Sequence, residues 1–307
     1  MPKLSVVIPM YFEEEVAEAC YQRLTAVLAA QAGYAYEMIF VNDGSTDRTG
    51  EILTAIAEKD ASVKIITFSR NFGHQAAVTA GLHFVQGDAV VIMDADLQDP
   101  PELIPQMLRL WEEGNDVIYG KRKSRIGESK FKLFTAKTFY LMLNALSDVE
   151  IPMDTGDFRL VDRRVVDTIN ALPEHNKFLR GLFSWVGYKQ TPLLYERQER
   201  YAGKTKYPLK KMMKLAQDGI ISFSTKPLKL VGGLGIFSIL LSFFLLIYSL
   251  LSYIFSFGSL APGWTSLMVT FTFLGGVILL SLWIIAEYIA RIYDETQNRP
   301  AYIIKDT

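Results

Sequence analysis

Hydrophobic and polar residues alternate with two different periods over the first 120 residues of the chain. Four short, almost continuous apolar runs have the length and β-branched composition of buried strands. They cover residues 4–9, 37–42, 63–68 and 89–94. The segments between them repeat apolar positions at the spacing of amphipathic helices, over residues 13–31, 49–58 and 75–85. This β-α-β-α order predicts an α/β domain with a mainly parallel sheet.

Polar side chains follow each of the four predicted strands. They are Tyr11 and Glu13 after the first, Asp43 after the second, Ser69, Arg70 and Asn71 after the third, and Asp94 and Asp96 after the fourth. Because α/β sheets bind ligands beyond the carboxyl ends of their strands, these residues predict a binding crevice at one edge. Neither the GxGxxG dinucleotide fingerprint nor the GxxxxGK[ST] P-loop occurs in the chain.

The segment VVIMDADLQDP carries the sharpest chemical signal in the sequence. Asp94 and Asp96 are spaced i, i+2 as the chain leaves a buried strand, so both carboxylates can face one site. Hard carboxylate oxygens suit Mg²⁺ or Mn²⁺, which bridges to diphosphate oxygens, and we predict such an ion here. Asp43 lies in VNDGSTDRT, where two roles are open: a structural residue of a turn, or an acceptor for a nucleotide base or ribose.

No charged residue occurs from residue 230 to residue 286, a stretch of 57 residues. One bilayer crossing needs about 20 apolar residues. We therefore predict two membrane-spanning helices, at residues 230–255 and 266–288, joined by the turn-rich SFGSLAPGW. Lys226, Lys229 and Arg291 flank the spans, and positive flanks mark the cytoplasmic side. We expect a multi-pass protein of the inner (plasma) membrane, with its soluble domain and both termini in the cytoplasm.

These patterns divide the chain into four parts. They are a soluble domain over 1–206, amphipathic juxtamembrane helices over 207–229, two transmembrane helices over 230–290 and a cytoplasmic tail over 291–307. The juxtamembrane segment YPLKKMMKLAQDGIISF mixes apolar and basic residues at helical spacing. It suits a helix in the plane of the membrane interface, and a helix packed on the soluble domain is the alternative.

The net charge of −1 conceals an uneven distribution, with −11 over residues 1–118 and +10 over the remainder. Residues 121–137 and 200–229 are basic clusters with net charges of +6 and +7. Such clusters bind phosphate groups or hold a domain against anionic lipid. Nucleic acid is another partner of basic clusters, but the adjoining apolar spans argue against it.

Cysteine and histidine are rare in the chain. Cys20 is the one cysteine and lies in a predicted helix, so we expect an ordinary buried thiol. His74, His83 and His175 lack the spacing of metal ligands, which argues against a zinc site.

Six motifs together resemble the inverting glycosyltransferases of the GT-A fold. They are VVIPMYFEEE, FVNDGSTDRT, FSRNFGHQAAVTAGL, VIMDADLQDPPELI, TGDFRLVDRRV and RYAGKTKYPL, in that order. More closely, the chain resembles the polyprenyl-phosphate glycosyltransferases, which include bactoprenol glucosyltransferases and dolichol-phosphate mannosyltransferases. The resemblance extends over nearly the whole chain. It implies a GT-A-type, Rossmann-like domain followed by the two transmembrane helices.

The resemblance also implies roles for individual residues. Asp94 and Asp96 would bind the metal and the diphosphate, and Asp157 of TGDFRL stands at the position of the family's candidate base. Asp157, Asp96 and Arg200 are the predicted catalytic residues. The residues predicted to contact the nucleotide are Pro9, Tyr11, Glu13, Asp43, Ser69, Arg70, Asn71 and Asp94. Those predicted at the acceptor phosphate are Arg122, Arg125, Lys204, Thr205 and Lys206.

A lipid phosphate changes what the site has to do. Its second pKa is about 6, so the nucleophile is mostly dianionic at neutral pH and needs no proton removed. We therefore expect Asp157 to organise the acceptor, the sugar or nearby basic groups, with general base as the alternative. The basic clusters would offset the repulsion between the two phosphate groups.

We predict an inverting, metal-dependent transfer of one hexose, most readily glucose from UDP-glucose, to undecaprenyl phosphate. Mannose or a modified sugar on the same lipid, and transfer to a protein or glycan hydroxyl, are alternatives within the same class. A catalytically silent membrane scaffold is the alternative of another class. The QxxRW motif of processive polysaccharide synthases is absent, since this region reads KFLRGLFSWVG. The resemblance further implies a homo-oligomer, with a tetramer as the expected form.

Overall fold

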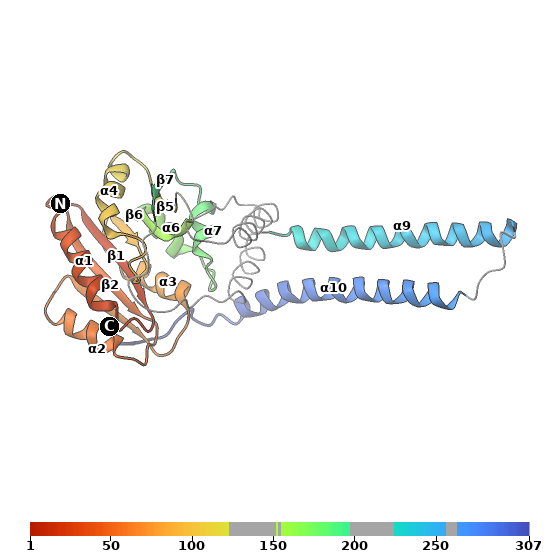
Figure 1. Ribbon diagram of the computed structural model, residues 1–307, viewed down its shortest axis with the longest axis horizontal. Helices are drawn as coiled ribbons and strands as arrows, with labels where there is room; N and C mark the ends of the chain where they lie inside the picture. Colours follow the sequence, from red (N-terminus) through yellow and green to blue (C-terminus); the bar gives the residue numbers. More distant parts are fainter. Residues whose placement is uncertain (123–151, 153–154, 197–223, 256–262, 307) are drawn as a thin grey trace.

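The computed structural model describes residues 1–122, 152, 155–196, 224–255 and 263–306. An α/β domain lies at one end of the molecule (Figure 1). Two long helices extend from it side by side, α9 (Lys226–Phe255) and α10 (Trp264–Thr296). Both helices point away from the domain, so the chain leaves the domain and returns to it.

Within the described residues, an eight-stranded sheet forms the centre of the domain, in the order β7-β5-β6-β4-β1-β2-β3-β8. The strands are β1 (Lys3–Met10), β2 (Ala35–Asn42), β3 (Val63–Phe68), β4 (Ala89–Ile92), β5 (Val117–Arg122), β6 (Thr155–Asp162), β7 (Gln190–Tyr195) and β8 (Ile304–Asp306). β1 is parallel to β2 and β4, and β2 to β3, so these four strands end at one edge. β6 runs antiparallel between β4 and β5, and β7 is parallel to β5.

Different helices cover the two faces of the sheet. On one face, Val6 and Ile8 of β1 belong to the cluster formed with α1 (Ala17–Ala29), α2 (Thr49–Ala57) and α4 (Ile104–Glu112). The short 3-10 helix η1 (Pro101–Leu103) leads into α4. On the other face, Val7 belongs to the cluster formed with α3 (His74–Phe84), α6 (Arg163–Ala171) and α7 (Leu179–Trp185). Because both faces are covered, β1 is a continuous apolar run.

The predicted strands and helices of the first 94 residues are present, and the predicted α/β fold is confirmed. Their ends differ from the predicted ones by up to four residues. The largest difference is at α1, which begins at Ala17 and not at residue 13. The amide of Glu13 instead donates to the Thr49 side chain, and its carbonyl accepts from Val16 and Ala17 in a turn. Cys20 is buried, as predicted.

Helices α9 and α10 contain the two predicted membrane spans. By length and composition, Lys226–Leu245 and Thr270–Thr296 are long and apolar enough to cross a bilayer, with mean hydropathies of 2.1 and 2.0. None of either stretch is buried against protein, and Ile239, Phe271 and Leu279 are among the apolar side chains left exposed. A helix that is apolar all round and uncovered by protein is typical of a membrane environment.

Residues 291–306, which belong to the predicted cytoplasmic tail, contain the end of α10 and the strand β8. Helix α10 continues to Thr296, and the chain then returns to the domain, where β8 pairs antiparallel with the edge strand β3. The end of α10 is also tied to the domain, because the Glu295 carboxylate accepts from the backbone amides of His175 and Asn176 at 3.0 and 3.3 Å. The α/β domain and the segment that follows the second span therefore lie at the same end of the pair of helices.

A buried carboxylate joins three strands and a loop near the amino ends of the parallel strands. Glu37 accepts hydrogen bonds from Lys3 and Lys64 at 2.8 and 2.9 Å, and its side chain is 2% exposed. Ser5 and the Gln86 amide bond its other oxygen at 2.6 and 2.7 Å. Burial alone would raise the pKa of Glu37, but these four donors lower it to about 2.

We predict that Glu37 makes the stability of the domain sensitive to acid. Its folded-state pKa lies below the model-peptide value of 4.5, so its contribution is present above that pH and is lost as the pH falls toward 2. The shift corresponds to about 3 kcal/mol at neutral pH. Glu37→Gln should therefore lower the unfolding temperature in detergent at pH 7, and the difference from wild type should shrink between pH 5 and pH 3. A difference that stays constant with pH would contradict this assignment.

Candidate active site

The carboxyl ends of the four parallel strands bring together the polar residues that the sequence singles out. Pro9 is buried near the end of β1, and Tyr11 and Glu13, which follow it, are half-buried. Asp43 and Asp96, after β2 and β4, are buried, whereas Asp94 is half-buried. Ser69, Arg70 and Asn71 follow β3 on the surface. The predicted polar edge is therefore formed, as parallel strands require.

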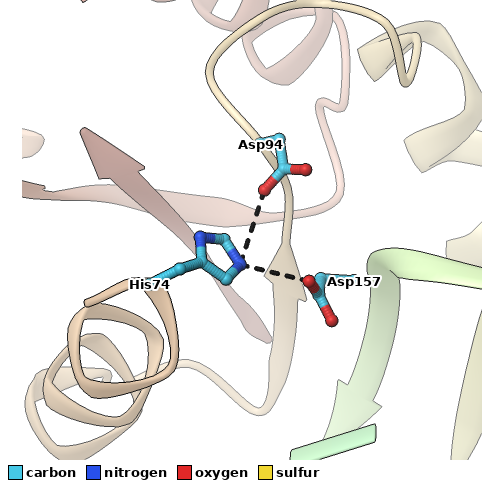
Figure 2. A group of neighbouring side chains, drawn as sticks. All are labelled: His74, Asp94 and Asp157. Atoms are coloured by element: carbon cyan, nitrogen blue, oxygen red, sulfur yellow. Dashed lines mark hydrogen bonds and ion pairs between the residues drawn. The ribbon is translucent and has the colours of Figure 1, made fainter. Parts of the chain in front are cut away.

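Antiparallel pairing adds Asp157 to this edge. Ile92 of β4 lies opposite Arg159 of β6, so the continuation of β4 approaches the beginning of β6. This register carries Asp94, two residues after Ile92, toward Asp157, two residues before Arg159. His74, the first residue of α3, points between the two carboxylates (Figure 2). Its Nε2 atom lies 3.1 Å from Asp157 Oδ2 and 3.7 Å from Asp94 Oδ1.

Asp157 is held by a bidentate contact. The Arg180 guanidinium, from the first turn of α7, donates to both carboxylate oxygens at 2.7 and 2.8 Å. Burial alone would raise the pKa of Asp157, but Arg180 and His74 hold it well below its usual range. A carboxylate with so low a pKa and both oxygens engaged is a weak proton acceptor. The geometry therefore favours the organising role for Asp157 over the general base.

His74 carries the opposite shift. Burial alone would lower its pKa, but the hydrogen bond to Asp157 and the charges of Asp94 and Asp157 raise it to about 9. Burial is also the main reason that the pKa of Asp94 rises, to about 6, with Asp157, Asp99 and Asp96 adding repulsion and His74 opposing it. At neutral pH His74 therefore holds a positive charge between two carboxylates.

Asp43 has the contacts of a loop organiser. Its carboxylate accepts hydrogen bonds from the amides of Phe72 and Gly73 at 2.7 and 3.0 Å, and from the Asn71 side chain at 2.8 Å. The neighbouring Gly44 has a positive φ, and a Cβ there would lie 2.4 Å from the backbone of Arg70. These contacts support the structural role for Asp43, which fixes the segment after β3.

The segment after β4 is bound from within the sheet. The Tyr195 hydroxyl at the end of β7 hydrogen-bonds Asp99, whose side chain is buried. Burial raises the pKa of the same tyrosine and the charge of the nearby Arg122 guanidinium opposes this rise, and a Cβ on Gly156 would lie 3.2 Å from that guanidinium. Arg122, predicted at the acceptor phosphate, thus has an internal partner beside the DADLQDP loop. Leu97 in this loop has a positive φ of 56°, so its backbone is strained at the candidate site.

Five of the predicted site residues lie outside the described part of the chain. They are Arg125, Arg200, Lys204, Thr205 and Lys206. The structure describes the residues predicted to contact the nucleotide, together with Asp157. The roles of these five residues stay predictions.

His74 and Arg180 contact Asp157 in the described site, although no local pattern in the sequence marks either one as a site residue. His74 was set aside because no other candidate ligand occurs at a helical or loop spacing from it, and spacing rules recognise only ligands that are close in sequence. Arg180 lies in KFLRGLF, a segment that is informative in the sequence only because it lacks the QxxRW motif. In both cases the partner is Asp157, 83 and 23 residues away.

The donor atoms suit a divalent cation. One ligand atom each from His74, Asp94 and Asp157 lie within 4.8 Å of one another. Carboxylates with an imidazole form a ligand set that Mn²⁺ accepts, whereas Mg²⁺ prefers oxygen alone. Because Arg180 engages both oxygens of Asp157, Asp94 and the nearby Asp96 are the carboxylates best suited to an ion. His74 would have to lose its proton before it could join them.

A cluster of acidic residues beyond the carboxyl ends of a mainly parallel sheet is the arrangement of a GT-A-type glycosyltransferase. Residues 5–169, more than half of the chain, match glycosyl transferase family 2, and the chain belongs to this family. It is 52% identical over 301 residues to YkcC, an uncharacterized glycosyltransferase of Bacillus subtilis, with 98% of this chain and 93% of YkcC covered. It is 41% identical over 303 residues to the SfII prophage-derived bactoprenol glucosyl transferase of Shigella flexneri, with 99% and 97% covered.

A solved structure supports the fold. Glucosyl-3-phosphoglycerate synthase from Mycobacterium tuberculosis, in complex with Mn²⁺, UDP and glucosyl-3-phosphoglycerate, matches with a TM-score of 0.51. The match covers 72% of this chain and 78% of that chain, at 19% identity. At this identity the likeness shows the shared fold, which is the predicted one.

We predict that Arg180 is needed to keep Asp157 charged in the interior. Arg180→Leu removes the bidentate partner and leaves Asp157 with His74, so the unfolding free energy should fall by about 3 kcal/mol. Adding Asp157→Asn should restore much of the loss, because the amide has no charge to compensate. Unfolding temperatures in detergent measure both effects.

A surface pair provides the control for this prediction. Arg164, which is 70% exposed, also pairs with a carboxylate, that of Asp116 at 2.7 Å. Arg164→Leu should leave stability nearly unchanged, because the Arg164 side chain is exposed and water screens its charge. Equal losses for the two arginine variants would show that the buried contact has no special importance.

Proposed function

We propose that this chain transfers one glucose, with inversion, from UDP-glucose to undecaprenyl phosphate at the cytoplasmic face of the membrane. The proposal rests on one observation: the same domain holds the His74, Asp94 and Asp157 cluster and is joined to two candidate membrane spans. Support for the sugar and the lipid comes from the bactoprenol glucosyl transferase to which the chain is 41% identical. The UDP part of the donor is proposed by analogy with the glucosyl-3-phosphoglycerate synthase of the same fold, whose structure contains UDP and Mn²⁺.

The reaction needs no base in this chain. An oxygen of the dianionic lipid phosphate attacks C1 of glucose, and the bond from C1 to the diphosphate oxygen breaks, so UDP leaves with the bonding electrons. No proton is transferred, because the phosphate is mostly deprotonated above its second pKa of about 6. Asp157, held by Arg180, orients the groups around C1 and stays ionised throughout.

Asp94 and Asp96 would hold the divalent cation. When bound, Mg²⁺ or Mn²⁺ neutralises the negative charge that develops on the departing diphosphate. The raised pKa of Asp94 marks a carboxylate whose charge is poorly compensated, since burial and three neighbouring carboxylates outweigh His74. A cation at this position would remove that repulsion.

The orientation of the membrane helices follows from their flanks. Lys226 and Lys229 lie at the start of the first apolar helix, and Arg291 lies near the end of the second. By the positive-inside rule these ends face the cytoplasm, and the α/β domain joins them there. Assembly into a homo-oligomer, with a tetramer as the expected form, stays a prediction that the mass of the detergent-solubilised protein tests.

We predict that Asp96→Asn lowers sugar transfer by about 100-fold or more while membrane insertion persists, because the amide binds a cation weakly. Radiolabelled transfer to undecaprenyl phosphate in proteoliposomes measures the loss. Chelation of divalent ions should abolish wild-type transfer, and Mn²⁺ or Mg²⁺ should restore it. Asp167→Asn, at an exposed side chain, is the matched control and should keep full activity. Full activity of Asp96→Asn would refute the assignment.

The identity of both substrates is tested with a panel of nucleotide sugars. UDP-glucose with undecaprenyl phosphate should give a glucosylated lipid, whereas the unphosphorylated alcohol should give none, because it lacks the nucleophile. If the protein transfers sugar only from another sugar nucleotide, the proposed sugar would be mannose or a modified sugar and not glucose. Transfer to the alcohol would indicate a hydroxyl acceptor, and the absence of both transfer and donor hydrolysis would indicate a silent scaffold.

A further inference from the structure

The segment that follows the second membrane helix contacts the predicted nucleotide-binding residues directly. β8 pairs with β3, with Phe68 opposite Ile304 and Thr67 opposite Asp306. At the next residue the Ser69 amide donates to the carbonyl of Ile303 at 3.0 Å. The last residues of the chain therefore hold the point at which β3 ends and the predicted nucleotide segment 69–71 begins.

Tyr302 forms the centre of this contact. Its ring stacks on Phe68, with centroids 5.1 Å apart and an angle of 11° between the planes. Its hydroxyl hydrogen-bonds His83 Nδ1 of α3 at 2.8 Å. Tyr302 and Ile304 also pack against the apolar cluster under this face of the sheet. The side chain thus joins the tail to both β3 and α3.

The contact continues from Phe68 into the exposed segment. Phe72 meets the Phe68 ring edge-on with centroids 5.7 Å apart. The Arg70 guanidinium lies over the Phe72 ring at 4.0 Å. Asp43 holds the amides of Phe72 and Gly73 from the opposite side. Residues 69–73 are therefore fixed between Asp43 and a stack of aromatic rings that ends at Tyr302.

The other end of the tail is fixed to the membrane helix. Glu295, near the end of α10, accepts from the amides of His175 and Asn176, and Arg291 donates to the Asn176 carbonyl at 2.6 Å. Helix α10 ends at Thr296, one residue after Glu295, and the chain reaches Tyr302 six residues later. The length of this connection keeps the tail close to β3.

We propose that Tyr302 is a positioning residue for the nucleotide sugar, acting through Phe68 and Ser69. This inference rests on the proposed function, because it requires that residues 69–71 contact the nucleotide. Ser69, Arg70 and Asn71 are exposed, so their conformation depends on what packs behind them. A protein segment that is ordered before binding loses less conformational entropy when the ligand binds. The affinity of the protein for that ligand is therefore higher. On this proposal, binding of the nucleotide sugar depends on residues 302–306, which follow both candidate membrane helices in the chain.

The test compares Tyr302→Ala, Tyr302→Phe and Lys305→Ala in the full-length protein. Tyr302→Ala removes the stack and should raise the KM for UDP-glucose by about 3- to 10-fold, with kcat and the KM for the lipid phosphate nearly unchanged. Tyr302→Phe keeps the ring and should restore most of the donor affinity. Lys305 is an exposed residue of β8, and Lys305→Ala should match the wild type.

Two further measurements separate positioning from loss of fold. Hydrogen exchange of peptides covering residues 63–73 should accelerate in Tyr302→Ala, with β1 and β4 unchanged. Calorimetry with UDP should give the same weakening as the KM. A fall in kcat alone, with the donor KM and exchange unchanged, would overturn the inference, because misfolding lowers the active fraction and leaves KM unaltered.

The failure of the proposed function gives a different result. A wild-type chain that binds UDP but transfers no glucose would refute the transfer, and the UDP affinities of the variants would still decide the role of Tyr302. A wild-type chain that transfers glucose, with UDP affinity unchanged in Tyr302→Ala, would refute the role of Tyr302 alone. A wild-type chain that binds no nucleotide would refute both.

Discussion

The site depends on the antiparallel register between β4 and β6. Parallel pairing of β1 to β4 explains why polar residues gather at one edge, but it supplies only carboxylates that follow those strands. The opposite direction of β6 allows its first residues, and not its last, to meet the end of β4. Asp157 thereby comes within reach of His74 and Asp94. A shift of one residue in this register would turn Asp157 to the other face of the sheet.

Charge compensation then decides what these residues can do. Three carboxylates close together would take up protons in the interior, and Arg180 and His74 prevent this for Asp157. Burial and neighbouring carboxylates raise the pKa of Asp94 in spite of His74, and a divalent cation stabilises a carboxylate in this condition. The two aspartates therefore differ in environment, and this difference separates an organising carboxylate from one that suits a metal.

The two long apolar helices and the α/β domain form one connected structure. A simple anchor would leave the domain attached by a single linker, whereas here the chain returns after α10 to add a strand and a cluster of hydrogen bonds. The edge strand β3 is covered as a result, which removes an exposed edge that would otherwise pair with other chains. The same strand leads into Ser69, so the edge that needs cover is also the one that leads to the predicted donor site.

The sequence by itself determined the parallel core, the acidic pair and the two apolar helices. Each depends on local patterns: continuous apolar runs, Asp94 and Asp96 two residues apart, and 57 residues without charge. It could not determine β6, β7 and β8, or the contacts of His74 and Arg180 with Asp157, because these join residues that are far apart in the chain. Asp43 was open for the same reason, since its partners lie 28 to 30 residues away. Only the tertiary structure decided these features, because strand register and buried charge pairing arise when distant segments pack together.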